Sequence, residues 1–357
     1  MSLTHNAFFK KVETQHKSNL PFVIYRNPNG SIINGLLQSN DELFFTENYT
    51  ERGFVFTPFE ENNKGILIPL ESAEIISTEA SVNSEITYDL ALQKEDTAKK
   101  RHLEIVSKTI DAIQNSTLEK VVVSRKKEIA IPNLEVISVF KKLVHTYGKA
   151  FCYLWYHPKV GVWLGATPET LLSVENGQFK TMALAGTQPY VDTINVEWGE
   201  KEKQEQQLVT DSILESIKPF IQNVSVSEVK TVQAGNLLHL RTDISGELAN
   251  ASIEKVITSL HPTPAVCGLP KKDAKQYILK HEGYNREFYT GFLGELNMSN
   301  DGNSKTELYV NLRCMQYSNS QKLQIYVGGG ITKDSNAASE WEETVNKTQT
   351  MLDVLLK

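Results

Sequence analysis

Short apolar runs joined by turn residues most strongly restrict how this chain can fold. Residues 20–70 contain a series of them, and residues 151–187 contain a second series. Runs of about four to eight residues rich in β-branched and aromatic side chains are typical of strands, and hairpin-length turns join such strands antiparallel. Helical stretches lie between the series rather than after each strand. The pattern therefore predicts an α+β fold with large antiparallel β-sheets flanked by helices, rather than a doubly wound parallel sheet.

Amphipathic helices are predicted in five stretches of the chain. In the first of them, Leu103, Val106, Ile110 and Ile113 are spaced three or four residues apart, which places them on one helical face. Residues 71–95 are polar with weak periodicity, so we expect them to connect elements rather than to form core. No strong linker or internal repeat divides the chain, and one integrated domain is expected. The predicted helices cover residues 95–116, 133–148, 197–220 and 252–260 and the C-terminal segment.

The composition argues against several classes of protein. A formal charge of −6 argues against a nucleic-acid partner, because nucleic-acid binding draws on a basic surface. No apolar run approaches the roughly 20 residues of a membrane span, and the N-terminus lacks the apolar core of a secretory signal. Cys152, Cys267 and Cys314 lie far apart, as expected of reduced, buried thiols without a catalytic role. These features predict a cytoplasmic protein that acts on a small molecule.

Paired glutamates on two predicted helices are the first candidates for chemistry. Glu340, Glu343 and Lys347 are spaced three and then four residues apart, so a helix places them on one face. Glu202 and Glu205 repeat the first of these spacings. Two such helices could converge on Mg²⁺, which prefers oxygen ligands. The alternative is that both are solvated helix faces, and the spacing alone does not show that they meet.

Three further features are candidates for ligand binding. The glycine run Gly328–Gly330 lacks the pattern of a phosphate-binding loop, and it indicates the close approach of a ligand or of another backbone segment. Arg313 lies within an apolar strand, where it either pairs with a buried carboxylate or presents its guanidinium to a carboxylate ligand. His261 is a candidate acid or base, although a histidine before proline in a turn is more often structural.

Taken together, these motifs resemble the chorismate-utilising enzymes, and within them most closely the isochorismate synthases. The similar segments occur in the order of that family over roughly residues 95–357, whereas the N-terminal β-rich part, residues 1–95, is less specific. We therefore expect residues 96–357 to form the catalytic core. The segments are "KVVVSR" (120–125), "GATPETLL" (165–172), "ALAGT" (183–187), "KEKQEQQLV" (201–209), "HPTPAVCGLP" (261–270), "REFYTGFLGE" (286–295), "LYVNLRC" (308–314), "YVGGGI" (326–331) and "EWEETVNK" (340–347).

The resemblance implies a metal site and a substrate. Mg²⁺ would be held directly by Glu205 and Glu343, with Glu202 and Glu340 acting through water, and Lys347 would balance their charge. In this family the metal binds the ring carboxylate of chorismate. The other substrate contacts implied by the motifs are Arg313, Tyr289 and the loop Gly328, Gly329 and Gly330, together with Gly186, Thr187 and Ala265.

The resemblance also assigns an acid and a base. Formation of isochorismate adds water at one ring carbon and expels a hydroxyl from another, so it needs a base for the water and an acid for the leaving group. The motifs assign these roles to Lys120 and Glu169. A lysine base must be neutral part of the time, and a glutamate acid must have a raised pKa, which a desolvated pocket provides.

Two positions separate branches of the family. Lys120 matches the water-activating lysine of isochorismate and salicylate synthases, and Ala185 stands where aminodeoxychorismate synthases carry a lysine. Gln206 and Gly329 depart from the common histidine and alanine, which bears on the shape of the pocket. We expect an isochorismate synthase serving menaquinone or siderophore synthesis, as a monomer without a glutamine amidotransferase subunit. A salicylate synthase and a non-catalytic relative remain the alternatives.

Overall fold

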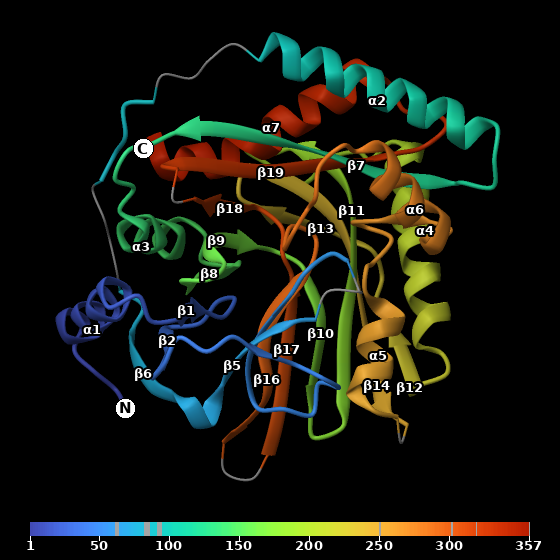
Figure 1. Ribbon diagram of the computed structural model, residues 1–357. Coiled ribbons are helices and arrows are strands. Elements are labelled where there is room, and N and C mark those ends of the chain that lie inside the picture. Colours follow the sequence, from blue (N-terminus) through green and yellow to red (C-terminus); the bar gives the residue numbers. More distant parts are fainter. Residues whose placement is uncertain are drawn as a thin grey trace.

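Two antiparallel β-sheets facing one another form the centre of the molecule (Figure 1). The computed structural model describes residues 1–60, 64–81, 86–90, 95–249, 251–300, 303–318 and 320–356. Helices cover the outer faces of both sheets, with α1 and α3 on one side of the molecule and α4 and α5 on the opposite side. The layers are therefore helix, sheet, sheet and helix.

Nine strands form the first sheet in the described part of the chain, and each neighbouring pair is antiparallel. The strand order joins the N-terminal strands to strands from the middle and the end of the chain. In this order the strands are β15 (Gly268–Leu269), β7 (Lys120–Ala130), β19 (Lys322–Ile331), β18 (Cys314–Tyr317), β9 (Gly161–Thr167), β8 (Phe151–His157), β1 (Phe22–Arg26), β2 (Ile32–Gln38) and β6 (Ala73–Glu79).

The second sheet is also antiparallel and contains ten described strands. One of them, β13 (Lys230–Ala234), pairs with β14 beside the main path of the sheet. The other strands, in order, are β12 (Ile221–Val226), β14 (Leu237–Leu248), β11 (Gln178–Pro189), β10 (Thr170–Glu175), β17 (Asn303–Val310), β16 (Phe292–Asn300), β4 (Gly53–Thr57), β5 (Ile66–Pro69) and β3 (Phe44–Phe45).

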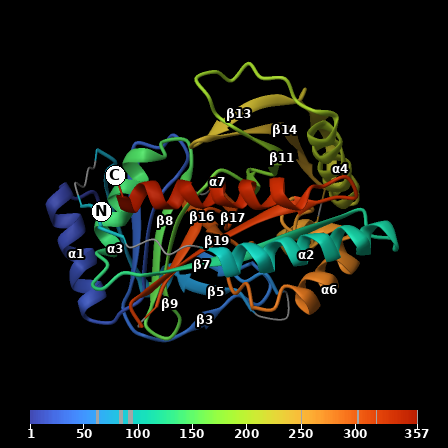
Figure 2. The ribbon, with the colours of Figure 1, turned by 90° about the horizontal axis from the view of Figure 1, so that it is seen from above.

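The helices pack on the sheets through their apolar faces. Helices α1 (His5–Lys17), α3 (Val136–Thr146) and α7 (Ala337–Leu356) bury side chains against the first sheet. Helices α4 (Glu200–Ile217) and α5 (Ile253–Leu260) cover the second sheet. Helices α2 (Asp96–Gln114) and α6 (Lys271–His281) pack against β7, and α2 lies beside α7 (Figure 2). A short 3₁₀ turn, η1 (Leu70–Ser72), precedes β6.

Aromatic side chains fill the space between the two sheets. Phe56 from the second sheet contacts Phe288 at a ring-centroid distance of 4.3 Å and Trp155 of the first sheet at 5.3 Å. Phe151 and Tyr309 stack at 4.2 Å. Each of these side chains is buried, and burying a large apolar side chain stabilises a fold by about 1.5–3 kcal/mol. The same core therefore holds the strands at the back of the pocket described below.

The predicted α+β fold is confirmed, and most predicted elements are present. The prediction that residues 71–95 only connect elements is wrong, because β6 lies in this stretch; its buried positions Ile76 and Thr78 alternate with exposed ones, and a threonine hides that pattern. Helices α1 and α6 were not predicted, and α3 begins at Val136, after Asn133 in the left-handed region with φ of 56°. None of the described helices is long and apolar enough to cross a membrane.

Candidate active site

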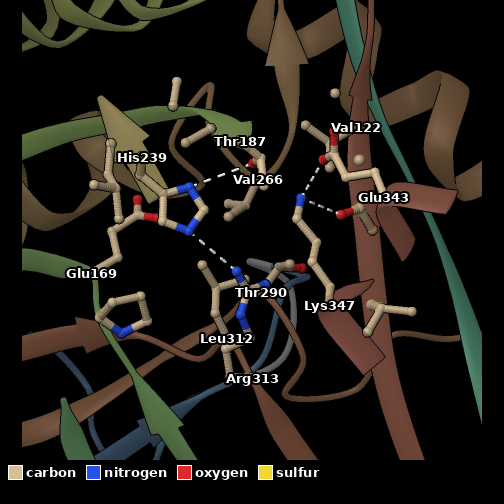
Figure 3. Close-up of a pocket in the computed structure, with 18 of the residues that line it drawn as sticks. Val122, Glu169, Thr187, His239, Val266, Thr290, Leu312, Arg313, Glu343 and Lys347 are labelled. Atoms are coloured by element: carbon tan, nitrogen blue, oxygen red, sulfur yellow. Dashed lines mark hydrogen bonds and ion pairs between the residues drawn. The ribbon is translucent and has the colours of Figure 1, made fainter. Parts of the chain in front are cut away.

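A cavity between the two sheets and α7 collects most of the residues predicted from the sequence (Figure 3). Strand β19 and helix α7 form one wall, and β11, β14 and the segment before β18 form the other. Lys120, Glu202 and Glu340 are the predicted site residues that do not line this cavity. The predicted residues in its wall are Glu169, Gly186, Thr187, Glu205, Ala265, Tyr289, Arg313, Gly328, Gly329, Gly330, Glu343 and Lys347.

The glycines of β19 allow charged side chains to lie directly against the strand. A methyl group on Gly330 would lie 2.7 Å from Oε1 of Glu205 and 2.7 Å from Cε of Lys120. On Gly329 it would lie 3.3 Å from Oε2 of Glu340 and 3.5 Å from Oε1 of Glu343. The glycine run predicted the close approach of a ligand or of a backbone segment; at Gly329 and Gly330 the close groups are instead side chains, including carboxylates from α4 and α7.

Each of three converging carboxylates is held by a lysine. Lys120 Nζ lies 2.8 Å from Glu205 Oε1, and the Lys120 side chain is only 1% exposed. Lys201 Nζ lies 2.8 Å from Glu340 Oε1, and Glu340 is 2% exposed. Lys347 pairs in the same way with Glu343. The alternative of a solvated face is thus wrong for Glu340, whose carboxylate points into the protein.

Lys347 connects helix α7 to the glycine strand. Its Nζ lies 2.5 Å from Glu343 Oε1 and donates a hydrogen bond of 2.9 Å to the carbonyl oxygen of Gly328 (Figure 3). The predicted charge balance between Lys347 and Glu343 is therefore present. Because the lysine also binds the strand, it fixes the position of α7 relative to the cavity wall.

Glu202 is not brought together with the other carboxylates. Its Oε2 lies over the start of α4, where a methyl group on Gly199 would be 2.6 Å away. A carboxylate near a helix N-terminus is stabilised by the exposed backbone N–H groups. The spacing of Glu202 and Glu205 places both on one helical face, but their carboxylates point in different directions.

The remaining acidic residues have donor atoms that suit Mg²⁺. Oxygen atoms of Glu205, Glu340 and Glu343 converge next to Gly329 and Gly330, and Mg²⁺ binds proteins through one or two carboxylates and several waters. Within the described residues, no group of three or more His, Cys, Asp or Glu side chains is already arranged around one point. Glu205 and Glu343 are each paired with a lysine, so a cation bound by these carboxylates would take the place of Lys120 and Lys347.

The pKa values of Glu205 and Glu340 are shifted in opposite directions. Burial alone would raise the pKa of Glu205, but the ammonium groups of Lys120, Lys347 and Lys201 together outweigh burial and leave that pKa below its usual range. Burial and the neighbouring Glu343 charge raise the pKa of Glu340. The positive groups around Glu205 therefore favour its charged form, which is the form that binds a metal.

Glu169 lies on the opposite wall in a dry environment. It follows Pro168 at the turn between β9 and β10 and is 3% exposed. Burial raises the pKa of Glu169 to about 7, although the charges of Lys120 and Arg313 and a hydrogen bond donated by the Thr263 hydroxyl at 3.5 Å oppose the rise. A carboxyl group with this pKa is available as a proton donor near neutral pH.

Arg313 meets a histidine that the sequence analysis did not select. Nη2 of Arg313 donates to Nε2 of His239 at 3.3 Å (Figure 3). Nδ1 of His239 donates to the carbonyl oxygen of Gly186 at 2.8 Å. Burial and the Arg313 charge lower the pKa of His239 to about 3, so the imidazole is neutral with its proton on Nδ1. The only sequence signal for this residue is a histidine within the apolar run of β14.

The surroundings of Arg313 favour its interpretation as a ligand-binding residue. No carboxylate in the described part of the chain forms an ion pair with its guanidinium, and Arg313 is half-buried and lines the cavity. Its backbone is in the left-handed region, with φ of 46°. A half-buried arginine held by a neutral histidine still has donors free for a carboxylate ligand.

Other candidates from the sequence are structural. His261 is buried away from the cavity, its ring lies 4.9 Å from that of Phe292, and burial lowers its pKa to about 3. Cys152, Cys267 and Cys314 are buried and form no disulfide, as predicted. Gln206, at the position of a common histidine, donates hydrogen bonds to the Ala183 carbonyl oxygen and the Thr242 hydroxyl, which attaches α4 to the second sheet.

The comparison with known proteins agrees with this geometry. The sequence profile of the chorismate binding enzymes matches residues 57–356. The chain belongs to this family.

Similar curated proteins are named isochorismate synthases. MenF of Pasteurella multocida is 27% identical over 311 residues, which cover 83% of this chain and 70% of that protein. DhbC of Bacillus subtilis is 28% identical over 266 residues, covering 69% and 65%. EntC of Escherichia coli is 34% identical over 207 residues, covering 54% and 51%. This chain thus spans between half and about two thirds of the length of the latter two relatives.

Solved structures show the same fold at low sequence identity. An isochorismate synthase structure, DhbC from Bacillus anthracis, has a TM-score of 0.79 at 22% identity and covers 97% of this chain and 99% of that one. MenF from Escherichia coli also has a TM-score of 0.79, at 21% identity, covering 94% and 89%. Anthranilate synthase component I from Streptococcus pneumoniae has a TM-score of 0.65 at 20% identity, covering 93% and 90%.

Proposed function

We propose that this protein converts chorismate to isochorismate. The observation that carries the proposal is that Glu169, with a carboxyl pKa of about 7, lines the same cavity as Glu205, whose carboxylate holds Lys120 Nζ at 2.8 Å. The family match and the relatives named isochorismate synthases support the identity of the substrate.

Lys120 and Glu169 have complementary roles in the proposed reaction. Lys120 Nζ, acting unprotonated, removes a proton from the water that adds to the ring. Glu169 donates its proton to the hydroxyl that leaves the ring as water. One water is added and one is lost, so the reaction is an isomerisation and consumes no oxidant or co-substrate. General acid and base catalysis of this kind contributes about 10²–10⁴-fold each.

The substrate carboxylates are held by cationic and hydrogen-bonding groups. Arg313 has free guanidinium donors in the cavity, and Tyr289 and the backbone of the β19 glycines line the same wall. His239, kept neutral by burial, orients Arg313 without adding charge of its own. These groups orient the ring between Lys120 and Glu169.

Mg²⁺ is part of the proposal. Glu205 and Glu343 would hold it directly and Glu340 through water, because their oxygens converge beside the β19 glycines. Glu202 would join them only if its carboxylate rotated away from the start of α4. When bound, the ion supplies positive charge that stabilises the substrate's ring carboxylate.

We further propose that the protein acts alone in the cytoplasm. Water as nucleophile requires no ammonia, so no glutamine amidotransferase subunit is needed, and a monomer suffices. The free buried thiols fit a reducing compartment. The product serves menaquinone or siderophore synthesis in this proposal, because relatives are named for both, as in a menaquinone-specific MenF and a vibriobactin-specific synthase.

Product analysis tests the proposal directly. The purified protein is incubated with chorismate, with and without Mg²⁺, and the products are separated by chromatography. Isochorismate formed only with Mg²⁺ is the expected result. Salicylate with pyruvate would identify a salicylate synthase instead, and unchanged chorismate under both conditions would indicate a non-catalytic relative.

A further inference from the structure

Two more cavities adjoin the candidate active site and share its walls. One, of about 330 Å³, has Arg313 and Pro168 in common with the active-site cavity. The other, of about 400 Å³, shares Lys149 and Ala234 with the 330 Å³ cavity. Pro168 lines all three, directly beside Glu169. The three spaces therefore adjoin one another around Pro168.

The walls of the two outer cavities have an unusual charge. The chain contains 43 acidic and 37 basic residues, yet no acidic side chain is among the described residues that line either outer cavity. Three cationic residues do line them, namely Lys149, Arg241 and Arg313. Arg241 pairs with Asp243 at 2.6 Å, whereas Lys149 is exposed and has no carboxylate partner in the described part of the chain. The lining therefore favours anions.

Hydrogen bonds between three elements build the wall of the nearer cavity. The hydroxyl of Tyr147, at the end of α3, donates to the carbonyl oxygen of Thr350 on α7 at 2.5 Å. The Thr350 hydroxyl donates to Asn236 Oδ1 at 2.9 Å in the turn between β13 and β14. A methyl group on Gly235 would lie 3.2 Å from the Tyr147 ring, so this turn packs closely on α3. The compartment is thus a built feature of the fold.

We infer that the two outer cavities form the path by which an anionic substrate reaches the active site. The inference rests on the proposed function, since chorismate carries two carboxylates. A protein of net charge −6 repels such an anion at long range, and a cleft lined by opposite charge raises its local concentration and its rate of entry. Lys149 attracts the substrate at the surface, and Arg313 receives its carboxylate where the path meets the active site.

A reversible plug at Ala234 tests the path. Ala234 lines both outer cavities and has no role in the proposed catalysis. The three native cysteines are 0% exposed. The cysteine introduced by Ala234→Cys is therefore the accessible target for a methanethiosulfonate reagent. The variant is labelled with either a methylthio group or a benzophenone group. We expect the bulky label to lower kcat/KM by about tenfold or more relative to the small one, because it fills the cavity. Reduction of the disulfide should restore the rate, which shows that the fold is intact.

A charge series at Lys149 tests the preference for anions. Lys149→Cys is labelled with an aminoethyl group, which restores the positive charge, or with a sulfonatoethyl group, which reverses it. At low ionic strength the aminoethyl form should have a kcat/KM about threefold to tenfold higher. The two values should converge at about 0.5 M salt, where charges are screened within a few ångströms. Lys10→Cys on α1, exposed and remote in the sequence from these cavities, is the matched control for both experiments.

The outcomes separate the path from the proposed function. If the bulky and small labels at Ala234→Cys give equal kcat/KM while the protein makes isochorismate, the path is refuted alone. If the bulky label lowers kcat/KM of Lys10→Cys as much as it lowers that of Ala234→Cys, the effect is general and the path is also refuted. If Lys149 charge has no effect at low salt, the anion preference is refuted. Wild-type protein that leaves chorismate unchanged refutes the proposed function, and this inference with it.

Discussion

Replacing Glu169 with glutamine should separate catalysis from stability in this protein. Glutamine has nearly the shape of the carboxyl group but no acidic proton, so the variant retains the cavity and loses the proton donor. We expect isochorismate formation to fall by about 10²–10⁴-fold, the usual contribution of a general acid. Chorismate affinity should change little, because Arg313 and the β19 glycines, rather than Glu169, are placed to bind the carboxylates.

The pH profile tests the same role in the wild-type protein. With a pKa of about 7, Glu169 is about 90% protonated at pH 6 and about 10% protonated at pH 8. The acid form is the active one, so kcat/KM should fall about tenfold per pH unit above 7. The residual activity of Glu169→Gln should lack this descending limb. A limb that persists unchanged in the variant would show that another group is the acid.

Glu169→Gln should lower activity but raise the free energy of unfolding at high pH. The pKa of Glu169 is raised from 4.5 to about 7 by folding, so the folded state binds the proton more tightly. The stabilisation is fully present below pH 4.5 and is lost as the pH rises through 7, at a cost of about 3 kcal/mol. Urea unfolding at pH 8 should therefore find Glu169→Gln more stable than the wild type. Equal midpoints at pH 8, or a less stable variant, would refute the buried, desolvated carboxyl.

Lys120→Gln should lower kcat by about 10²–10⁴-fold, because it removes the base, and calorimetry should find little change in chorismate affinity. Wild-type turnover would refute the role of Lys120 as base. Lost affinity with preserved kcat would make Lys120 a binding residue. Glu205→Ala and Glu343→Ala should abolish turnover and Mg²⁺ binding by calorimetry; near wild-type turnover at saturating Mg²⁺ would contradict the metal site. Glu205→Ala should also lower the unfolding temperature, because it leaves the buried Lys120 ammonium without its partner. His239→Phe should raise KM, by a factor about ten times larger than the factor by which it lowers kcat, because Arg313 loses the partner that orients it. An unchanged KM would contradict the positioning role of His239.

Short apolar runs between turn residues predicted most of the fold, and the failures of this prediction have physical causes. Strands β1 and β8 are continuous runs of this kind because both of their faces are buried. Helix α1 buries only Phe8, Phe9 and Val12, and α6 only Ala274 and Ile278, so neither shows a long apolar stripe. Such helices depend on contacts with a sheet that the local sequence does not describe.

The candidate site was predictable in its residue types and only partly in its geometry. Helical spacing correctly placed Glu340 and Glu343 on one face, but the meeting of α7 with α4 depends on both sheets. Spacing also grouped Glu202 with Glu205, whereas the rotamer of Glu202 turns its carboxylate toward the helix start. His239 has no motif of its own, because its role arises from a contact with Arg313 across 74 residues.

The arrangement of the ion pairs suggests why the site needs two sheets. Lys120 on β7 and Glu169 after β9 belong to the first sheet and its connection, while Glu205 comes from the helix that covers the second. A lysine and a carboxylate 2.8 Å apart in a buried site hold each other in place, so the position of Lys120 depends on α4, which brings Glu205 to it. A cation bound by Glu205 would separate this ion pair and release Lys120 Nζ for the proposed role as base. Cation binding and the position of Lys120 would therefore be linked through Glu205.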